Sequence, residues 1–228
     1  MSTVDRNIYH PLLIRFARTD LMRFIGHLDW VALQQSIFLR SGFKLSQSPG
    51  PTKRIVIKTS PPTPLGTASM AEFTYVQLVD HIYPEEAARR MSGHCPDGIR
   101  VMYCRDAALL KRKNPFGSIE AAMYSLDLGS DSDASSFELV MSALEKIRSG
   151  EIPDGMDPDE IKGFWGRILE IDRDADCINL LCPQVEGKAF HATKCAQFLQ
   201  DTLGIPHFPI FTKLDYYRLA PSKRRLFQ

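Results

Sequence analysis

The chain has 228 residues, of which 44% are hydrophobic and 24% charged, a composition ordinary for a folded globular protein. The formal net charge is +1, so no field of the whole protein attracts nucleic acid or membranes, and such binding would depend on local patches. No apolar run approaches the roughly 20 residues that a membrane-spanning helix needs, and Met1–Arg6 contains no apolar signal core. We therefore expect a cytoplasmic protein with no membrane partner and room for two domains of about 100 residues each.

The first half of the chain predicts six elements in the order strand, helix, strand, strand, helix, strand. Leu12–Arg18 alternates as a strand does. The following run has one apolar face and is followed by Gly42, as helices often are. A proline-rich connection (60–64) separates the two middle strands. The predicted ranges are strand 12–18, helix 29–41, strands 54–58 and 73–79, a helix from Pro84, and strand 99–104.

The second half predicts the same six elements again. Ser135 and Glu138 have the spacing of a capping box ahead of a helix. Two strands surround Asp174-Ala175-Asp176 as a hairpin, and a second helix stops at Gly204 and Pro206. The predicted ranges are strand 122–128, a helix after Ser135, strands 167–172 and 178–182, helix 192–203, and strand 208–218.

The repeated order strand–helix–strand–strand–helix–strand predicts an α+β protein of two tandem ferredoxin-like (βαββαβ) modules with antiparallel sheets. In each module both helices lie on one face of the sheet, so the other face is free to be solvated, to bind or to pack. We place the N-terminal module at residues 1–113 and the C-terminal module, with its basic tail, at 114–228.

The five cysteines favour neither a disulfide framework nor a metal centre. Their number is odd and their spacing scattered, with no Cys-x-x-Cys pair and no cluster suited to iron and sulfur. Cys177 and Cys182 lie five positions apart along a predicted strand, so their side chains should face opposite ways. The scattered histidines show no ligand spacing. We expect no metal and no cofactor in this chain.

Several short motifs follow one another between Leu12 and Leu128. They are Ile14-Arg15-Phe16, Arg23-Phe24-Ile25-Gly26-His27-Leu28-Asp29, Ser46-Gln47, Pro64-Leu65-Gly66 with Ser69, Glu72-Phe73, Pro96-Asp97-Gly98-Ile99-Arg100-Val101 and Ala121-Ala122-Met123-Tyr124. In order and spacing they resemble the radical-SAM-linked protein family, a domain of unknown function. The resemblance implies a radical SAM protein as partner, encoded beside this chain or fused to it. The chain itself has no Cys-x-x-x-Cys-x-x-Cys run and is not the radical enzyme.

The chain departs from the family pattern in two places. Relatives have a Gly-Phe-Asn-Pro-His-Pro-Lys-like loop after the second Ser-Gln, whereas Ser48–Arg54 here lacks the Asn and the His and keeps the basic end. An Asp in the strand after Glu72 is replaced by Tyr75. These losses favour a binding or accessory role over catalysis.

The candidate site residues are mostly cations near the first strand–helix junction. Helix N-termini attract anions, and Arg15, Arg23, His27, Lys53 and Arg54 would form one recognition surface for RNA or another anionic substrate if the loops meet. The alternative is a solvated charged face.

His27 and Asp29 are the weak catalytic candidates of this sequence. His27 suits a general acid, a general base or a phosphate contact, or it hydrogen-bonds the backbone or Asp29 at the start of the helix. Asp29 favours the helix dipole without any further role.

Two basic runs and three aromatic residues are weaker candidates for nucleic-acid contacts. The runs, Lys111–Lys113 and Lys223–Arg225, either bind nucleic acid or only solvate the chain. Phe211, Tyr216 and Tyr217 either stack on bases or pack in a core.

The sequence thus leads to an accessory or substrate-binding protein, binding RNA or another anionic substrate for a partner radical SAM enzyme. Two alternatives stay open: an enzyme acting on RNA with His27 and Asp29 as acid–base groups, and a pure protein–protein docking module.

Overall fold

The structure is a computed structural model that describes residues 9–48, 51–110, 113–129, 132–152, 168–174, 177–184, 190–205, 207–219 and 224–227. The chain divides into two compact units. Unit 1 comprises Met1–Pro62 and Glu72–Gly117, and unit 2 comprises Thr63–Ala71 and Ser118–Gln228. Among the helices that the structure describes, none combines the length and the apolar character needed to cross a membrane.

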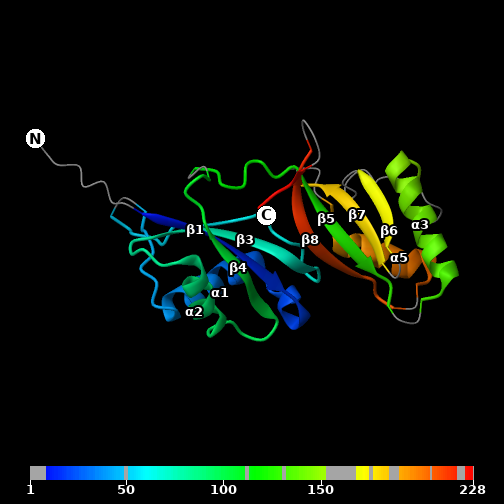
Figure 1. The fold of residues 1–228 in the computed structure, drawn as a ribbon. Helices are drawn as coiled ribbons and strands as arrows, with labels where there is room; N and C mark the ends of the chain where they lie inside the picture. Colours follow the sequence, from blue (N-terminus) through cyan, green and yellow to red (C-terminus); the bar gives the residue numbers. More distant parts are fainter. Residues whose placement is uncertain are drawn as a thin grey trace, which may run out of the picture. The chain divides into compact units, whose positions relative to one another are not determined.

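The described residues of unit 1 form strands and α-helices in the predicted order, most of which Figure 1 labels. They are β1 (His10–Arg18), the 3-10 helix η1 (Asp20–Phe24), α1 (His27–Arg40), β2 (Ile57–Thr59), β3 (Ala68–Leu78), α2 (Pro84–Ser92) and β4 (Ile99–Asp106). The strand order is β4-β1-β3, with β2 on β3, and the β1–β4 and β2–β3 pairs are antiparallel.

The core of unit 1 lies between the helices and one face of this sheet. Alternate residues of β1 point to that face, and Phe16 meets Trp30 of α1 edge to face, with ring centroids 5.4 Å apart. The N-cap of α1 is Gly26, and Gly42 follows its end with a φ of 75°. A glycine adopts this left-handed conformation without the strain of a Cβ.

Unit 2 repeats the order of elements. They are β5 (Ala121–Asp127), α3 (Ala134–Ser149), β6 (Glu170–Asp174), β7 (Cys177–Pro183), α5 (Ala192–Leu203), β8 (Ile210–Arg218) and the short β9 (Arg224–Arg225). The strand order is β8-β5-β7-β6, all antiparallel, with β9 beside β8. Tyr124, Phe190 and Phe211 form an aromatic cluster in its core.

A segment from the first half of the chain completes unit 2. Ala68 and Ser69 at the start of β3 pair in parallel with Thr212 and Lys213 of β8. The buried ammonium of Lys213 donates a hydrogen bond to the Thr63 hydroxyl at the beginning of the same segment. Residues 63–71 are therefore held to unit 2 through Thr63 and through Ala68 and Ser69. Their composition does not predict this association with unit 2.

The structure confirms an α+β protein with mainly antiparallel pairing, as predicted. It corrects the start of α3, where a capping box at Ser135 and Glu138 was expected. The N-cap is Asp133, whose carboxylate accepts a hydrogen bond from the Ser136 backbone N–H at 2.8 Å. An aspartate two residues upstream offers a stronger acceptor than a serine hydroxyl, and the helix starts there.

Candidate functional site

The sheet face of unit 1 that points away from α1 and α2 carries arginines beside aromatic rings. The guanidinium carbon of Arg15 on β1 lies 5.4 Å from the ring centroid of Phe73 and 5.9 Å from that of Tyr103. The guanidinium carbon of Arg105 on β4 lies 4.6 Å from the same Tyr103 ring. Such contacts hold a guanidinium in place while it remains a cation.

A register shift brings a third arginine to this face. The β1–β4 pairing shifts directly after Arg15, so that Arg105 opposes Leu13 and Arg100 opposes Ala17. Leu13, Arg15 and Ala17 share one face of β1, and both β4 arginines therefore share it too. Arg100 and Arg105 are exposed and Arg15 is half-buried. We call Arg15, Arg100 and Arg105 the arginine face.

The strand positions around the arginine face carry no carboxylate. Lys58 of β2 opposes Tyr75 of β3 and adds a fourth cation, whose ammonium donates a 2.8 Å hydrogen bond to the Lys113 carbonyl. The described strand positions that share this face are Leu13, Arg15, Ala17, Lys58, Phe73, Tyr75, Gln77, Arg100, Tyr103 and Arg105. Four basic side chains thus share this face of a chain whose formal net charge is +1.

The strand–helix junction holds Arg23, His27 and Asp29 in separate positions. Arg23 is half-buried, and its guanidinium carbon lies 4.9 Å from the Phe24 ring centroid. Its Nε atom has no hydrogen-bond partner among the described residues. His27 is the first residue of α1 and Asp29 is exposed in its first turn. Two positions apart on a helix, these side chains do not face each other.

The predicted recognition surface is spread over unit 1. Lys53 lines a pocket with Tyr9, which precedes β1, whereas Arg23 and His27 follow the end of β1. A nine-residue strand separates its two ends by roughly 30 Å. Arg15 lies on the sheet face that α1 does not cover. The structure thus brings Lys53 together with Arg54, and Arg23 close to His27, but does not assemble the five residues.

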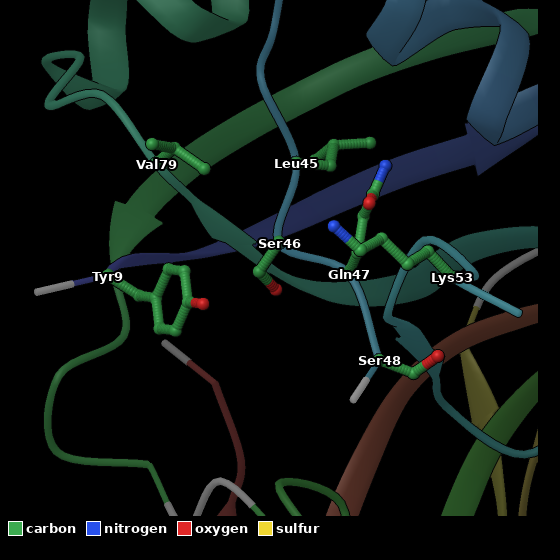
Figure 2. Close-up of a pocket in the computed structure, with 7 residues that line it drawn as sticks. All are labelled: Tyr9, Leu45, Ser46, Gln47, Ser48, Lys53 and Val79. Carbon is green, nitrogen blue, oxygen red and sulfur yellow. The ribbon is translucent and has the colours of Figure 1, made fainter. Parts of the chain in front are cut away.

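A pocket of about 280 Å³ lies at the Lys53 end of unit 1. Figure 2 shows Tyr9 and Lys53 on the two sides of Ser46 and Gln47. Its lining residues are Tyr9, Leu45, Ser46, Gln47, Ser48, Lys53 and Val79. Ser46 and Gln47 were noted in the sequence as motif residues but not as site candidates.

Backbone hydrogen bonds fix the wall of this pocket. The Ser46 N–H donates to the Gln77 carbonyl at 2.8 Å, and the Val56 N–H donates to the Ser46 carbonyl at 3.1 Å. The loop that carries Lys53 is closed where the Ser48 N–H donates to the Arg54 carbonyl at 2.8 Å. The Arg54 N–H in turn donates to the Ser48 hydroxyl at 3.1 Å. The lining residues are thus attached to the end of β3.

The remaining aromatic candidates are largely packed in a core. Phe211 is 2% exposed and Tyr216 is fully buried, so they do not present rings for base stacking. Of the basic runs, Lys111, Arg112 and Lys223 lie outside the described residues.

The titratable groups of the described residues form no metal centre. No group of three His, Cys, Asp or Glu side chains there has the arrangement to hold a metal ion. Burial raises the pKa of the Cys95 thiol to about 11. Burial, with the negative charge of Glu85 as a smaller cause, raises that of Cys104 to about 12. These thiols are protonated at neutral pH and poorly nucleophilic.

Comparisons with known proteins identify a family and no activity. Residues 12–153 match the family described as an uncharacterized protein conserved in bacteria (DUF2344). No curated protein matches the chain. One similar solved structure is an unknown protein from Galdieria sulphuraria, with 11% identity and a TM-score of 0.26, covering 90% of this chain and 99% of the other.

Proposed function

The chain belongs to the DUF2344 family, and we propose that it is an accessory protein that binds single-stranded RNA on the arginine face of unit 1. The observation that carries this proposal is that Arg15, Arg100 and Arg105 share one sheet face, on which Arg100 and Arg105 are exposed. Arginine forks bind phosphate oxygens in two places at once and suit a polyanion.

The geometry favours a single strand over a duplex. Exposed guanidinium groups along a strand can contact successive phosphates and stack on bases of an extended nucleic acid. On the arginine face these are Arg100 and Arg105 of β4, whereas Leu13, Ala17 and Phe73 are buried. The rings of Phe73 and Tyr103 already contact Arg15. We therefore assign the rings to positioning the arginines, and the arginines to contacting the nucleic acid.

Fluorescence anisotropy with a labelled oligouridylate over a salt series tests the proposal. Three phosphate contacts on a single strand give a slope of log K against log salt of about −2. A variant with Arg100→Ala and Arg105→Ala should bind more weakly and lose about two thirds of that slope. Arg40→Ala is the control, because Arg40 is exposed in the last turn of α1. This substitution removes one positive charge on the side of the sheet that the helices cover.

Two results would refute RNA binding here. One is no binding at about 50 mM salt, where electrostatic binding is strong. The other is an equal loss of affinity in the double variant and in Arg40→Ala. Equally tight binding of a deoxyoligonucleotide would support the proposed binding surface but would contradict a preference for RNA.

The radical SAM partner is proposed from the motif resemblance alone. The full chain, used as bait in the organism that encodes it, should retain a protein with a Cys-x-x-x-Cys-x-x-Cys motif. The absence of such a protein from ribonuclease-treated and untreated samples alike would remove this part of the proposal.

We further propose that the two units are a duplicated ferredoxin-like module. The orders β4-β1-β3-β2 and β8-β5-β7-β6 are equivalent when each unit is numbered from its own first strand, which supports this origin. An experimental structure in which residues 10–106 and 121–218 do not superpose in this order would contradict it. Limited proteolysis tests the proposed domain boundary, with first cleavage expected near Lys113.

A further inference from the structure

The pocket at the Lys53 end of unit 1 contains a buried hydroxyl without a partner. Ser46 is 3% exposed, and its Oγ atom has no hydrogen-bond partner in the part of the chain that the structure describes. Buried hydroxyl groups are nearly always hydrogen-bonded, because burying a hydroxyl without a hydrogen bond destabilises the folded protein. The Ser46 backbone is fully engaged, with its N–H and its carbonyl both bonded. The hydroxyl is therefore not needed to hold this segment to the end of β3.

The surroundings of the Ser46 hydroxyl indicate what kind of group would satisfy it. Lys53 is exposed and lines the same pocket, so its ammonium is available to a ligand. The Gln47 amide, which lines the same pocket (Figure 2), adds a donor and an acceptor. None of the described residues that line the pocket carries a carboxylate. An anion fits this donor set, because a hydroxyl, an amide and an ammonium all donate to negatively charged oxygens.

The other wall of the pocket is apolar. Leu45 is 8% exposed and Val79 is 47% exposed, and both line the pocket. Val79 is an exposed aliphatic side chain at the end of a strand, which a ligand would remove from water. A bare inorganic ion would leave this wall unused.

We propose that this pocket binds a small organic anion, a carboxylate or phosphate monoester with a compact apolar body. The charged end meets Lys53, Ser46 and Gln47, and the body lies against Leu45 and Val79. About 280 Å³ is just below the usual size range of small-ligand pockets and admits one ring with its charged group. The site is separate from the arginine face and does not depend on RNA binding.

Nuclear magnetic resonance titration of the ¹⁵N-labelled full chain tests the site with phenyl phosphate and benzoate as probes. Amide shifts should change at Ser46, Gln47 and Lys53, with a Kd of about 1 mM for ligands of this size. A shift with phenyl phosphate alone or with benzoate alone identifies the anion class. No saturable shift at these amides with either probe overturns the proposal.

Two variants distinguish a specific contact from a general effect of charge. Lys53→Met should weaken probe binding about tenfold, as expected for the loss of a charged hydrogen bond. Lys44→Gln is the matched control, because Lys44 is an exposed lysine near the pocket that does not line it and pairs with Asp80 at 3.0 Å. An equal loss of affinity in both variants overturns the proposal.

Ser46→Ala gives a readout that a purely structural serine would not give. Removing a buried hydroxyl without a partner should leave Tm unchanged or raise it, while probe affinity falls several-fold. A lower Tm with unchanged probe affinity means that the hydroxyl serves the fold and overturns its assignment to the ligand. An oligouridylate that shifts these amides and displaces both probes would make the pocket part of the nucleic-acid surface, which also overturns the proposal.

Discussion

Gly98 offers the sharpest test of how unit 1 is assembled. Its φ is 81°, and a Cβ added there would lie 2.9 Å from the Thr19 carbonyl oxygen and 3.1 Å from the Met22 Cγ. The Gly98 carbonyl accepts a 2.8 Å hydrogen bond from the Thr19 N–H. The start of β4 thus packs directly on the turn that follows β1, and only a residue without a side chain permits this approach.

Gly98→Ala should therefore cost two separate penalties. The left-handed conformation costs about 1–2 kcal/mol for a residue with a Cβ, and forcing a methyl group against a backbone oxygen adds about 1–3 kcal/mol. Gly42→Ala is the matched control in the same unit, since Gly42 has a φ of 75° with no atom within 4 Å of the added Cβ. Gly42→Ala should therefore have only the cost of the left-handed conformation.

Urea unfolding followed by circular dichroism measures both variants against the parent chain. Gly98→Ala should lose about 1–3 kcal/mol more than Gly42→Ala, for the clash that only Gly98 has. In a chain of this size each 1 kcal/mol lowers Tm by about 2–4 °C. Equal losses would show that the contact with Thr19 relaxes without cost, and the close-approach explanation of Gly98 would be wrong.

Three further predictions concern the thiols, the segment 63–71 and a helix cap. Because their pKa values are raised to about 11 and about 12, Cys95 and Cys104 should react with iodoacetamide at about pH 8 more slowly than a free thiol, whose pKa is about 8.5. The stability that these protonated thiols contribute is complete below that unfolded-state pKa and should fall as pH rises toward 11–12, measured by urea unfolding. Thr193→Val removes a 2.5 Å hydrogen bond to the Leu65 carbonyl and should cost about 0.5–1 kcal/mol, with faster amide exchange in residues 63–71. Hydrogen bonds from the first turn of α3 lower the pKa of Asp133, so the stability lost in Asp133→Ala should be present above about pH 4 and shrink as pH falls.

Local periodicity was enough to predict the elements, because it depends only on neighbouring residues. The alternation along β1 is enough to place Arg15 on the face opposite Ile14 and Phe16, which is the face away from the helices. The first residues of β3 were not predicted. Ala68 and Ser69 have weak strand propensity, and they become a strand by pairing with β8, which is distant in sequence.

The arginine face was only partly predictable. Strict alternation puts Arg100 and Arg105, five positions apart, on opposite faces of a strand. They share a face because the register shifts beside Arg15, and a bulge of this kind has no reliable signal in a single sequence. The sequence could therefore find one arginine of the surface but not the other two.

The positions of Lys53, Arg23 and His27 relative to one another follow from the sheet. Lys53 lines a pocket with Tyr9, which precedes β1, whereas Arg23 and His27 follow the end of β1. Charge type alone contains no information about which end of a strand a loop occupies. The pocket beside Lys53 also needed Ser46, whose significance lies in burial without a partner, a property that no sequence pattern reveals.

The motif residues of unit 1 fall into two groups: those whose contacts stabilise the fold, and those whose side chains make no such contact. The turn that follows β1 packs on Gly98 and leads to Arg23 and His27. The motif that contains Gly98 and the motif that contains Arg23 and His27 are therefore neighbours because of this packing. Ser46 differs, because its backbone builds the sheet edge while its hydroxyl does nothing for the fold. A motif residue whose side chain the fold does not use is the better candidate for function. By this criterion Ser46 and Arg23, whose buried Oγ and Nε atoms both lack a partner among the described residues, are the motif residues to test first.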